Sequence, residues 1–191
     1  MNKVQYYIQW LRRIGYCRGF GVQSPSAYRF IRYVVNEHYP YYAYGDLRKA
    51  LPGIDRLTRK RMELYFRIAN YRQAAVWTDF GGDADLLARY VQRGCNAMRV
   101  RSIDKADDLG AVEVMRICPA PGCDDVLRKA LRHADDGLML VIEDIGRDGA
   151  AKRMWQTLLA SESVSVSYDL YYLGIAFFDR KRFKRNYIVN F

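Results

Sequence analysis

Two kinds of hydrophobic pattern divide the chain near residue 73. Before it, apolar residues recur every three or four positions, which predicts helices over residues 4–14, 24–39 and 55–72. Ser24 is a suitable N-cap for the second helix, Pro25 suits its first turn, and Pro40 closes it. The expected inward faces consist of Val4, Tyr7, Ile8, Leu11 and Ile14 in the first helix, and of Leu57, Leu64, Tyr65 and Ile68 in the third, whose outer face is basic.

After residue 73, short β-like runs alternate with helical ones. Strands are predicted at residues 74–80, 97–103, 112–117 and 138–145, and helices at 84–93, 124–133 and 149–160. Residues 163–180 indicate a terminal hairpin that turns at Leu173-Gly174, and residues 184–191 are consistent with one more short strand. This order predicts an α/β fold with a mostly parallel sheet, a C-terminal antiparallel hairpin and preceding N-terminal helices.

One connection in this half is short for a parallel sheet. Only residues 105–111 separate Asp104 from the strand that begins at Val112, whereas a parallel crossover normally takes about a dozen residues or more. Two arrangements therefore stay open. The two strands are joined by an unusually short crossover, or residues 98–103 and 112–117 form an antiparallel hairpin.

The length and composition favour a single domain. The chain has 191 residues, half of them hydrophobic, and we expect residues 1–72 to pack as a basic helical segment on an α/β core of residues 73–191. No apolar run approaches the roughly 20 residues of a membrane span, and the first residues lack the pattern of a secretory signal, so a cytoplasmic location is expected. The four cysteines form no CxxC pair, and the spacing of Cys118 and Cys123 favours thiols over a metal site.

The positive charge is concentrated in the N-terminal segment. Residues 1–73 contain 14 Lys and Arg against 4 Asp and Glu, which equals the net charge of +10 for the whole chain. A basic segment rich in tyrosine is compatible with binding to nucleic acid. A solvated cationic face whose tyrosines pack on the fold explains it equally, and no recognised nucleic-acid motif accompanies it.

A glycine-containing turn follows the first predicted strand. It reads Asp79-Phe80-Gly81-Gly82-Asp83 and leads directly into a helix, which is where α/β folds place nucleotide ligands. The turn matches neither the dinucleotide fingerprint nor the P-loop. A tight turn with Asp83 as the helix cap is the alternative explanation.

Several stretches resemble class I S-adenosylmethionine-dependent methyltransferases, in particular a bacterial group of small-molecule O-methyltransferases. "GFGVQSPSAYRFIRYVVNE" is similar to the helix that precedes their core, "VIEDIG" to the fifth strand with its acidic end, and "VSVSYDLYYLGIAFFDRKRFKRNYIVNF" to the terminal hairpin. The resemblance covers the chain from about residue 15. It is loose in the middle, where the family's helix, third strand and following helix are missing after Asp104.

The resemblance implies a set of site residues. The cofactor S-adenosylmethionine would lie against Asp79, Phe80, Gly81, Gly82 and Asp83. Asp85 stands where the family has its last glycine.

Asp104 would hold the ribose of the cofactor, or it simply begins a polar turn. Glu143 and Asp144 would supply the local base, or they are exposed acids that cap the helix near residue 149. No complete Mg²⁺ site is expected, because the position after residue 117 lacks an acid.

Three functions are consistent with these residues. The first is a methyltransferase acting on an unknown small-molecule acceptor. The second is a degenerate methyltransferase fold without cofactor that serves as a binding or scaffold module. The third is a nucleic-acid binder that uses the basic N-terminal segment.

Overall fold

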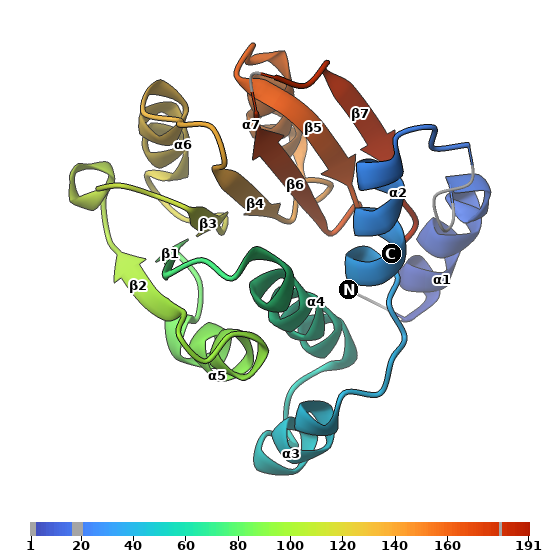
Figure 1. Cartoon of the computed structure of the whole chain (residues 1–191). Coiled ribbons are helices and arrows are strands. Elements are labelled where there is room, and N and C mark those ends of the chain that lie inside the picture. The colour runs from blue at the N-terminus through green and yellow to red at the C-terminus, as the bar shows by residue number, and fades with distance from the viewer. Residues whose placement is uncertain (1–2, 17–20, 180) are drawn as a thin grey trace.

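A single seven-stranded sheet forms the centre of the molecule (Figure 1). The computed structural model describes residues 3–16, 21–179 and 181–191, with side chains from residue 7 onward. Strands β1, β2, β3 and β4 are mutually parallel, β6 is antiparallel to β4 and β5, and β7 is parallel to β5. In sheet order the strands are β2 (Arg99–Ile103), β1 (Val76–Phe80), β3 (Val114–Ile117), β4 (Met139–Glu143), β6 (Leu173–Phe178), β5 (Val164–Asp169) and β7 (Arg185–Ile188).

Helices cover both faces of this sheet. The first half of the chain forms α1 (Lys3–Arg12), α2 (Pro25–Phe30) with a π-helical continuation over Ile31–Val35, α3 (Tyr42–Ala50) and α4 (Arg56–Arg72). The second half adds α5 (Ala84–Gly94), α6 (Cys123–Arg132) and α7 (Gly149–Ala160). Helices α2, α4 and α5 share one apolar core with the sheet, and α6 and α7 share a second core on its other face. The α/β fold expected from the alternating pattern is confirmed.

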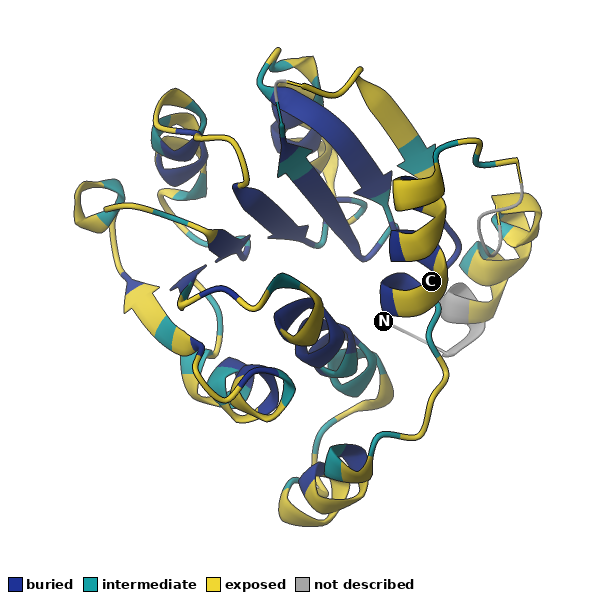
Figure 2. Ribbon diagram, viewed as in Figure 1, coloured by how far each residue is buried: buried dark blue, intermediate teal, exposed yellow. Residues whose placement is uncertain are grey.

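The N-terminal helices lie close to where the periodicity predicts them. Ser24 caps α2 by accepting a hydrogen bond from the Ala27 amide, and Leu64, Tyr65 and Ile68 of α4 are fully buried. The basic outer face expected for α4 is only partly correct, because Arg61 and Arg67 are buried. Figure 2 shows that many residues of α4 are buried, whereas the coloured part of α1 is mostly exposed.

The expected burial of the α1 apolar face is wrong. Its residues Tyr7, Ile8 and Leu11, and Ile14 just beyond the helix, are each more than 40% exposed. The side chain of Val4 lies outside the described side chains, and residues 17–20 lie outside the described residues.

The short connection after β2 is a true parallel crossover. Strands β2 and β3 pair in parallel with opposite sides of β1, so the alternative of a local hairpin is wrong. Residues 104–113 make this crossing with no more than a 3₁₀ turn at Ala106–Asp108. Strand β2 is one of the two edge strands, with β7 at the opposite edge, and most residues of β2 are exposed.

The terminal hairpin is present, with a different turn. Strand β6 already begins at Leu173, and the reversal is made by Leu170–Tyr172, where Tyr171 has a φ of 69°. Residues 184–191 do contain the additional strand β7. Among the residues that the structure describes, none of the helices is both long and apolar enough to span a bilayer.

Candidate functional site

The glycine turn lies at the carboxyl end of β1, near the middle of the parallel half of the sheet. Asp79 is completely buried, and Gly81 has a φ of 71°, a conformation that favours glycine. Phe80 is buried in the second core, and its carbonyl accepts a hydrogen bond from the Cys118 amide at 2.9 Å. Asp83 then caps α5 by accepting a hydrogen bond from the Leu86 amide at 2.8 Å.

A buried arginine from β3 occupies the space beside this turn. Arg116 is 1% exposed, and its guanidinium donates two hydrogen bonds to Asp79, at 2.6 Å to Oδ1 and 2.9 Å to Oδ2. It also donates to the Asp83 carbonyl at 3.1 Å and reaches Glu143 Oε1 at 3.3 Å. This two-point geometry is the one that arginine and carboxylate prefer, so Arg116 is held in a fixed position.

The guanidinium fills the volume that the glycines leave open. A Cβ atom placed on Gly82 would lie 2.3 Å from Arg116 Nη2 and 2.9 Å from Cys118 Sγ. On Gly81 it would lie 2.7 Å from Ala120 Cβ. The small residues of the turn therefore accommodate other parts of this chain, chiefly the side chain of Arg116.

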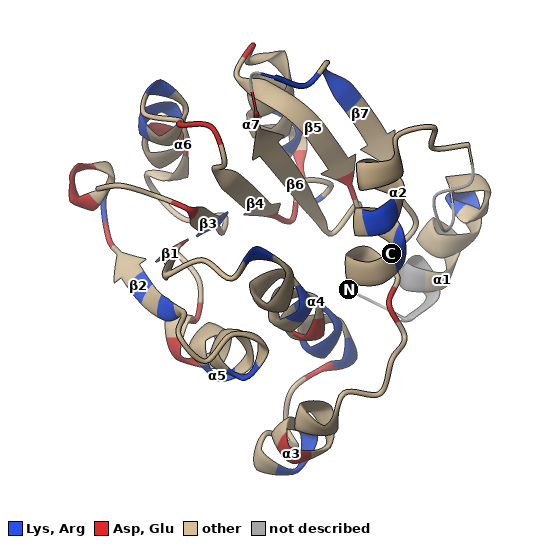
Figure 3. Ribbon diagram, viewed as in Figure 1, with Lys and Arg blue, Asp and Glu red and all other residues tan. Residues whose placement is uncertain are grey.

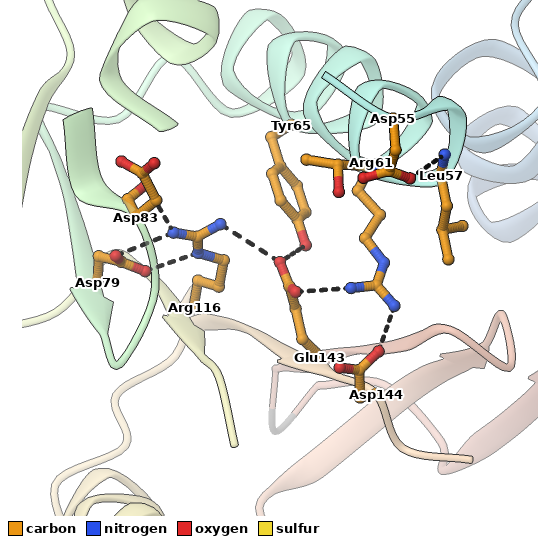
Figure 4. Close-up of polar contacts among 10 residues, drawn as sticks. Asp55, Leu57, Arg61, Tyr65, Asp79, Asp83, Arg116, Glu143 and Asp144 are labelled. Atoms are coloured by element: carbon orange, nitrogen blue, oxygen red, sulfur yellow. Dashed lines mark hydrogen bonds and ion pairs between the residues drawn. The ribbon is translucent and has the colours of Figure 1, made fainter. Parts of the chain in front are cut away.

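A second arginine continues the network across the sheet (Figure 4). Tyr65 donates a hydrogen bond to Glu143 Oε1 at 2.6 Å, and Arg61 of the same helix donates to Glu143 Oε2 at 2.9 Å. Arg61 is also paired with Asp144. The two acids are thus joined by one guanidinium. They are not exposed caps, because Glu143 is buried and Asp148 caps α7.

Burial and charge pairing act against each other in this cluster. Burial lowers the pKa of Arg116, but its hydrogen bonds with Asp79 outweigh this effect, and the resulting pKa lies above the ordinary value. Burial, reinforced by the negative charge of Glu143, raises the pKa of the Tyr65 hydroxyl well above normal. The arginines therefore stay charged and Tyr65 stays a hydrogen-bond donor at neutral pH.

The side chains of Asp104, Cys118 and Cys123 make none of the hydrogen bonds of this network, although Cys118 Sγ lies beside the glycine turn. Asp104 follows β2 at the exposed edge of the sheet. Cys118 is a buried free thiol whose pKa is raised by burial and by Glu143, and Cys123 is a separate free thiol. Within the described part of the chain, no group of three or more His, Cys, Asp or Glu side chains is arranged to hold a metal ion.

A cleft opens to solvent beside Arg61 and Asp144, at the end of the network away from the glycine turn. It measures about 840 Å³ and lies between α1, the start of α4 and the turns after β4 and β5. Arg61 and Asp144 belong to both the network and the cleft wall. The full lining is Ile8, Gln9, Arg12, Asp55, Leu57, Thr58, Arg61, Asp144, Gly146, Arg147, Tyr171 and Tyr172.

Arg116, Arg61 and Tyr65 were not predicted as site residues. The sequence did contain one signal for Arg116. It interrupts the apolar run of β3, a strand that lies between β1 and β4 and is completely buried. An arginine at such a position requires an acidic partner. Which acid it meets depends on the strand order, and the local pattern does not contain that information.

Comparison with known proteins supports the architecture. No protein-family model matches the chain, and the comparison with curated proteins found no match. Among solved structures, the chain is similar to the O-methyltransferase TomG from Streptomyces achromogenes, crystallised in complex with SAM, with 12% identity and a TM-score of 0.50 over 74% of this chain and 91% of TomG. The chain has a class I methyltransferase-like fold.

This methyltransferase-like fold also matches, less closely, the mitomycin 7-O-methyltransferase MmcR. That match has 11% identity and a TM-score of 0.37 over 90% of this chain and 66% of MmcR, and a TM-score this low supports no conclusion about function. At these identities the similarity describes the fold alone, so function has to be argued from this chain's own residues.

Proposed function

We propose that this protein is a binding or scaffold module with a methyltransferase-like fold, in which the Arg116 side chain takes the place of a cofactor at the glycine turn. The observation that supports the proposal is the position of the guanidinium, 2.3 Å from where a Gly82 Cβ would stand. A ligand that leaned on this turn would have to displace Arg116 and leave Asp79 without its partner. As they are arranged, these residues do not fit S-adenosylmethionine.

The ligand of such a module would occupy the 840 Å³ cleft, because this is where the charged network reaches solvent. Three arginines and two aspartates line it, together with the rings of Tyr171 and Tyr172. Arg61 is committed to Glu143 and Asp144, so a ligand would meet the more exposed Arg12 and Arg147, of which Arg147 also pairs with Asp148 at 2.9 Å. This wall favours a small aromatic anion.

A methyltransferase acting on an unknown small-molecule acceptor is the second candidate. Two observations favour it: the turn from Asp79 to Asp83 follows a central parallel strand, and TomG was crystallised with SAM on a similar fold. In that case Asp104 would hold the ribose, and Glu143 or Asp144 would serve as the base after release from Arg61. The role as base requires the ion pairs of Arg61 with these two acids to open.

Calorimetric titration with S-adenosylmethionine and S-adenosylhomocysteine distinguishes the two candidates. We expect no saturable heat at millimolar ligand. Saturable binding that Asp104→Ala weakens, and that the neighbouring Asp108→Ala leaves unchanged, would establish the second candidate and overturn the first. Both aspartates are exposed, so neither variant disturbs the core.

The cleft is tested separately with phenyl phosphate and benzoate as probes. Saturable thermal stabilisation that Arg12→Ala or Arg147→Ala reduces would support the cleft as the binding site. Arg128→Ala is the matched control, because Arg128 is exposed on α6 and pairs with Asp125 outside the cleft. Stabilisation by neither probe would count against an anion site in the cleft.

A further inference from the structure

Helix α1 contacts the rest of the molecule through its polar side. Gln9 is half-buried in the wall of the cleft, and Arg13, just beyond the helix, forms an ion pair of 2.9 Å with Asp169. The Trp10 carbonyl accepts a hydrogen bond from Asn190 Nδ2 at 3.1 Å. These contacts fix which side of α1 faces inward.

The apolar side of α1 consequently faces solvent. Tyr7, Trp10 and Leu11 share one helix face by their spacing of three and four residues, and they are 53%, 40% and 59% exposed. Ile14 and Tyr16 extend the exposed apolar surface just beyond the helix, each at 52%. An ordinary surface helix has the opposite orientation, with its apolar stripe toward the core. A helix whose apolar side faces solvent indicates a surface that is covered by a membrane or by another molecule.

We propose that this face of α1 lies on an anionic lipid surface. Trp and Tyr prefer the boundary between headgroups and acyl chains, and aliphatic side chains such as Leu11 gain from burial just beneath it. The N-terminal segment has the matching sign of charge. Residues 1–73 contain 14 Lys and Arg against 4 Asp and Glu, and Arg29 and Arg32 of the α2 region are exposed. Figure 3 shows basic residues in blue on both α1 and α2, namely Arg12 and Arg29.

The N-terminal part of the sequence contains further exposed aromatic residues. Tyr28 and Tyr33 of the α2 region and Tyr39 and Tyr42 around the start of α3 are 41% to 93% exposed. Amphipathic rings at many points suit a broad interface better than a single pocket. The inference is independent of the function proposed for the cleft, which uses the opposite side of α1.

Two other occupants fit the surface less well. Nucleic acid would use the arginines and tyrosines but would gain nothing from Leu11 and Ile14, which offer no stacking surface. A second copy of this chain would bring two strongly basic N-terminal segments together, and like charges at close range repel. A lipid surface uses the aliphatic, aromatic and basic residues at once.

The tryptophans provide a direct test. Trp10 is exposed, whereas Trp77 is completely buried and Trp155 is 6% exposed, so a change in emission on vesicle binding reports Trp10. With vesicles of phosphatidylcholine and phosphatidylglycerol at 3:1, we expect co-sedimentation and a blue shift in emission. Trp10→Phe should keep the co-sedimentation and lose the blue shift.

A pair of variants tests the face itself. Leu11→Glu should weaken vesicle binding roughly tenfold or more, because it removes one buried leucine and adds a like charge to the lipid. Ala97→Glu is the control that adds the same charge elsewhere, since Ala97 is exposed just before β2, at the edge of the sheet opposite β7, and it should bind as the wild type does.

Three results would overturn the proposal: no co-sedimentation with anionic vesicles at low salt, unchanged binding by Leu11→Glu, or displacement from vesicles by duplex DNA. Self-association that replaces vesicle binding would assign the face to a second copy.

Discussion

Removing the guanidinium of Arg116 tests whether the glycine turn is a structural junction. Asp79 is completely buried and receives both of its short hydrogen bonds from Arg116. Arg116→Met keeps an unbranched side chain of similar length but leaves a buried carboxylate without its partner. Breaking a buried pair in this way typically costs about 3–5 kcal/mol. For a chain of 191 residues this corresponds to a fall in Tm of roughly 6–20 °C.

Urea denaturation followed by far-UV circular dichroism measures this loss. The double variant Asp79→Leu with Arg116→Met removes both charges, and we expect it to be more stable than Arg116→Met alone, because no isolated charge is left in the core. Arg128→Met is the control. Its partner Asp125 is exposed, so its cost should stay below about 1 kcal/mol.

Two outcomes would refute the reasoning. One is an Arg116→Met protein within about 1 kcal/mol of the wild type, which would mean that water or another group solvates Asp79. The other is a double variant whose loss of unfolding free energy equals the sum of the losses in Asp79→Leu and Arg116→Met measured separately. Free-energy losses add for independent residues, whereas those of two paired residues do not.

Three further predictions address other parts of the fold. Gly94→Ala should destabilise the protein by about 1–3 kcal/mol in urea denaturation, because the new Cβ would lie 2.2 Å from the Phe66 carbonyl oxygen where α5 crosses α4. Asp83→Ala should cost about 0.5–2 kcal/mol through loss of the cap on the Leu86 amide, with a fall in Tm as the readout. Burial, with the nearby arginines, lowers the pKa of Lys60 from 10.5 to about 8. Between those pH values the folded protein therefore binds fewer protons than the unfolded chain. This lysine consequently makes the free energy of unfolding rise with pH from about 8 to 10.5. Lys60→Met should flatten that rise, as measured by urea unfolding curves at a series of pH values.

The fold was largely predictable because its signals are local. Periodicity places most helices and strands, and Ser24 and Asp83 are capping residues that act within three positions of themselves. Adjacent strand–helix units also imply a parallel sheet. The turn of the hairpin was misplaced because Tyr171, a residue that rarely adopts a positive φ, occupies it.

The candidate site was less predictable because its contacts join distant parts of the chain. Arg116 meets Asp79 and Glu143 only because β3 lies between β1 and β4, an order that periodicity does not encode. The predicted orientation of α1 was wrong for a related reason. An apolar stripe predicts that something covers it, but the sequence does not specify whether the cover belongs to the same molecule.

The last residues of the chain hold the first helix in place. The Asn190 amide donates to the Tyr16 carbonyl, its side chain donates to the Trp10 carbonyl, and Asp169 pairs with Arg13. During translation, α1 would leave the ribosome well before residue 190 and would lack its docking surface until residues near 190 had emerged. At roughly 5–20 residues per second, that interval is on the order of ten seconds or more. Helix α1 is therefore synthesised long before the surface on which it docks.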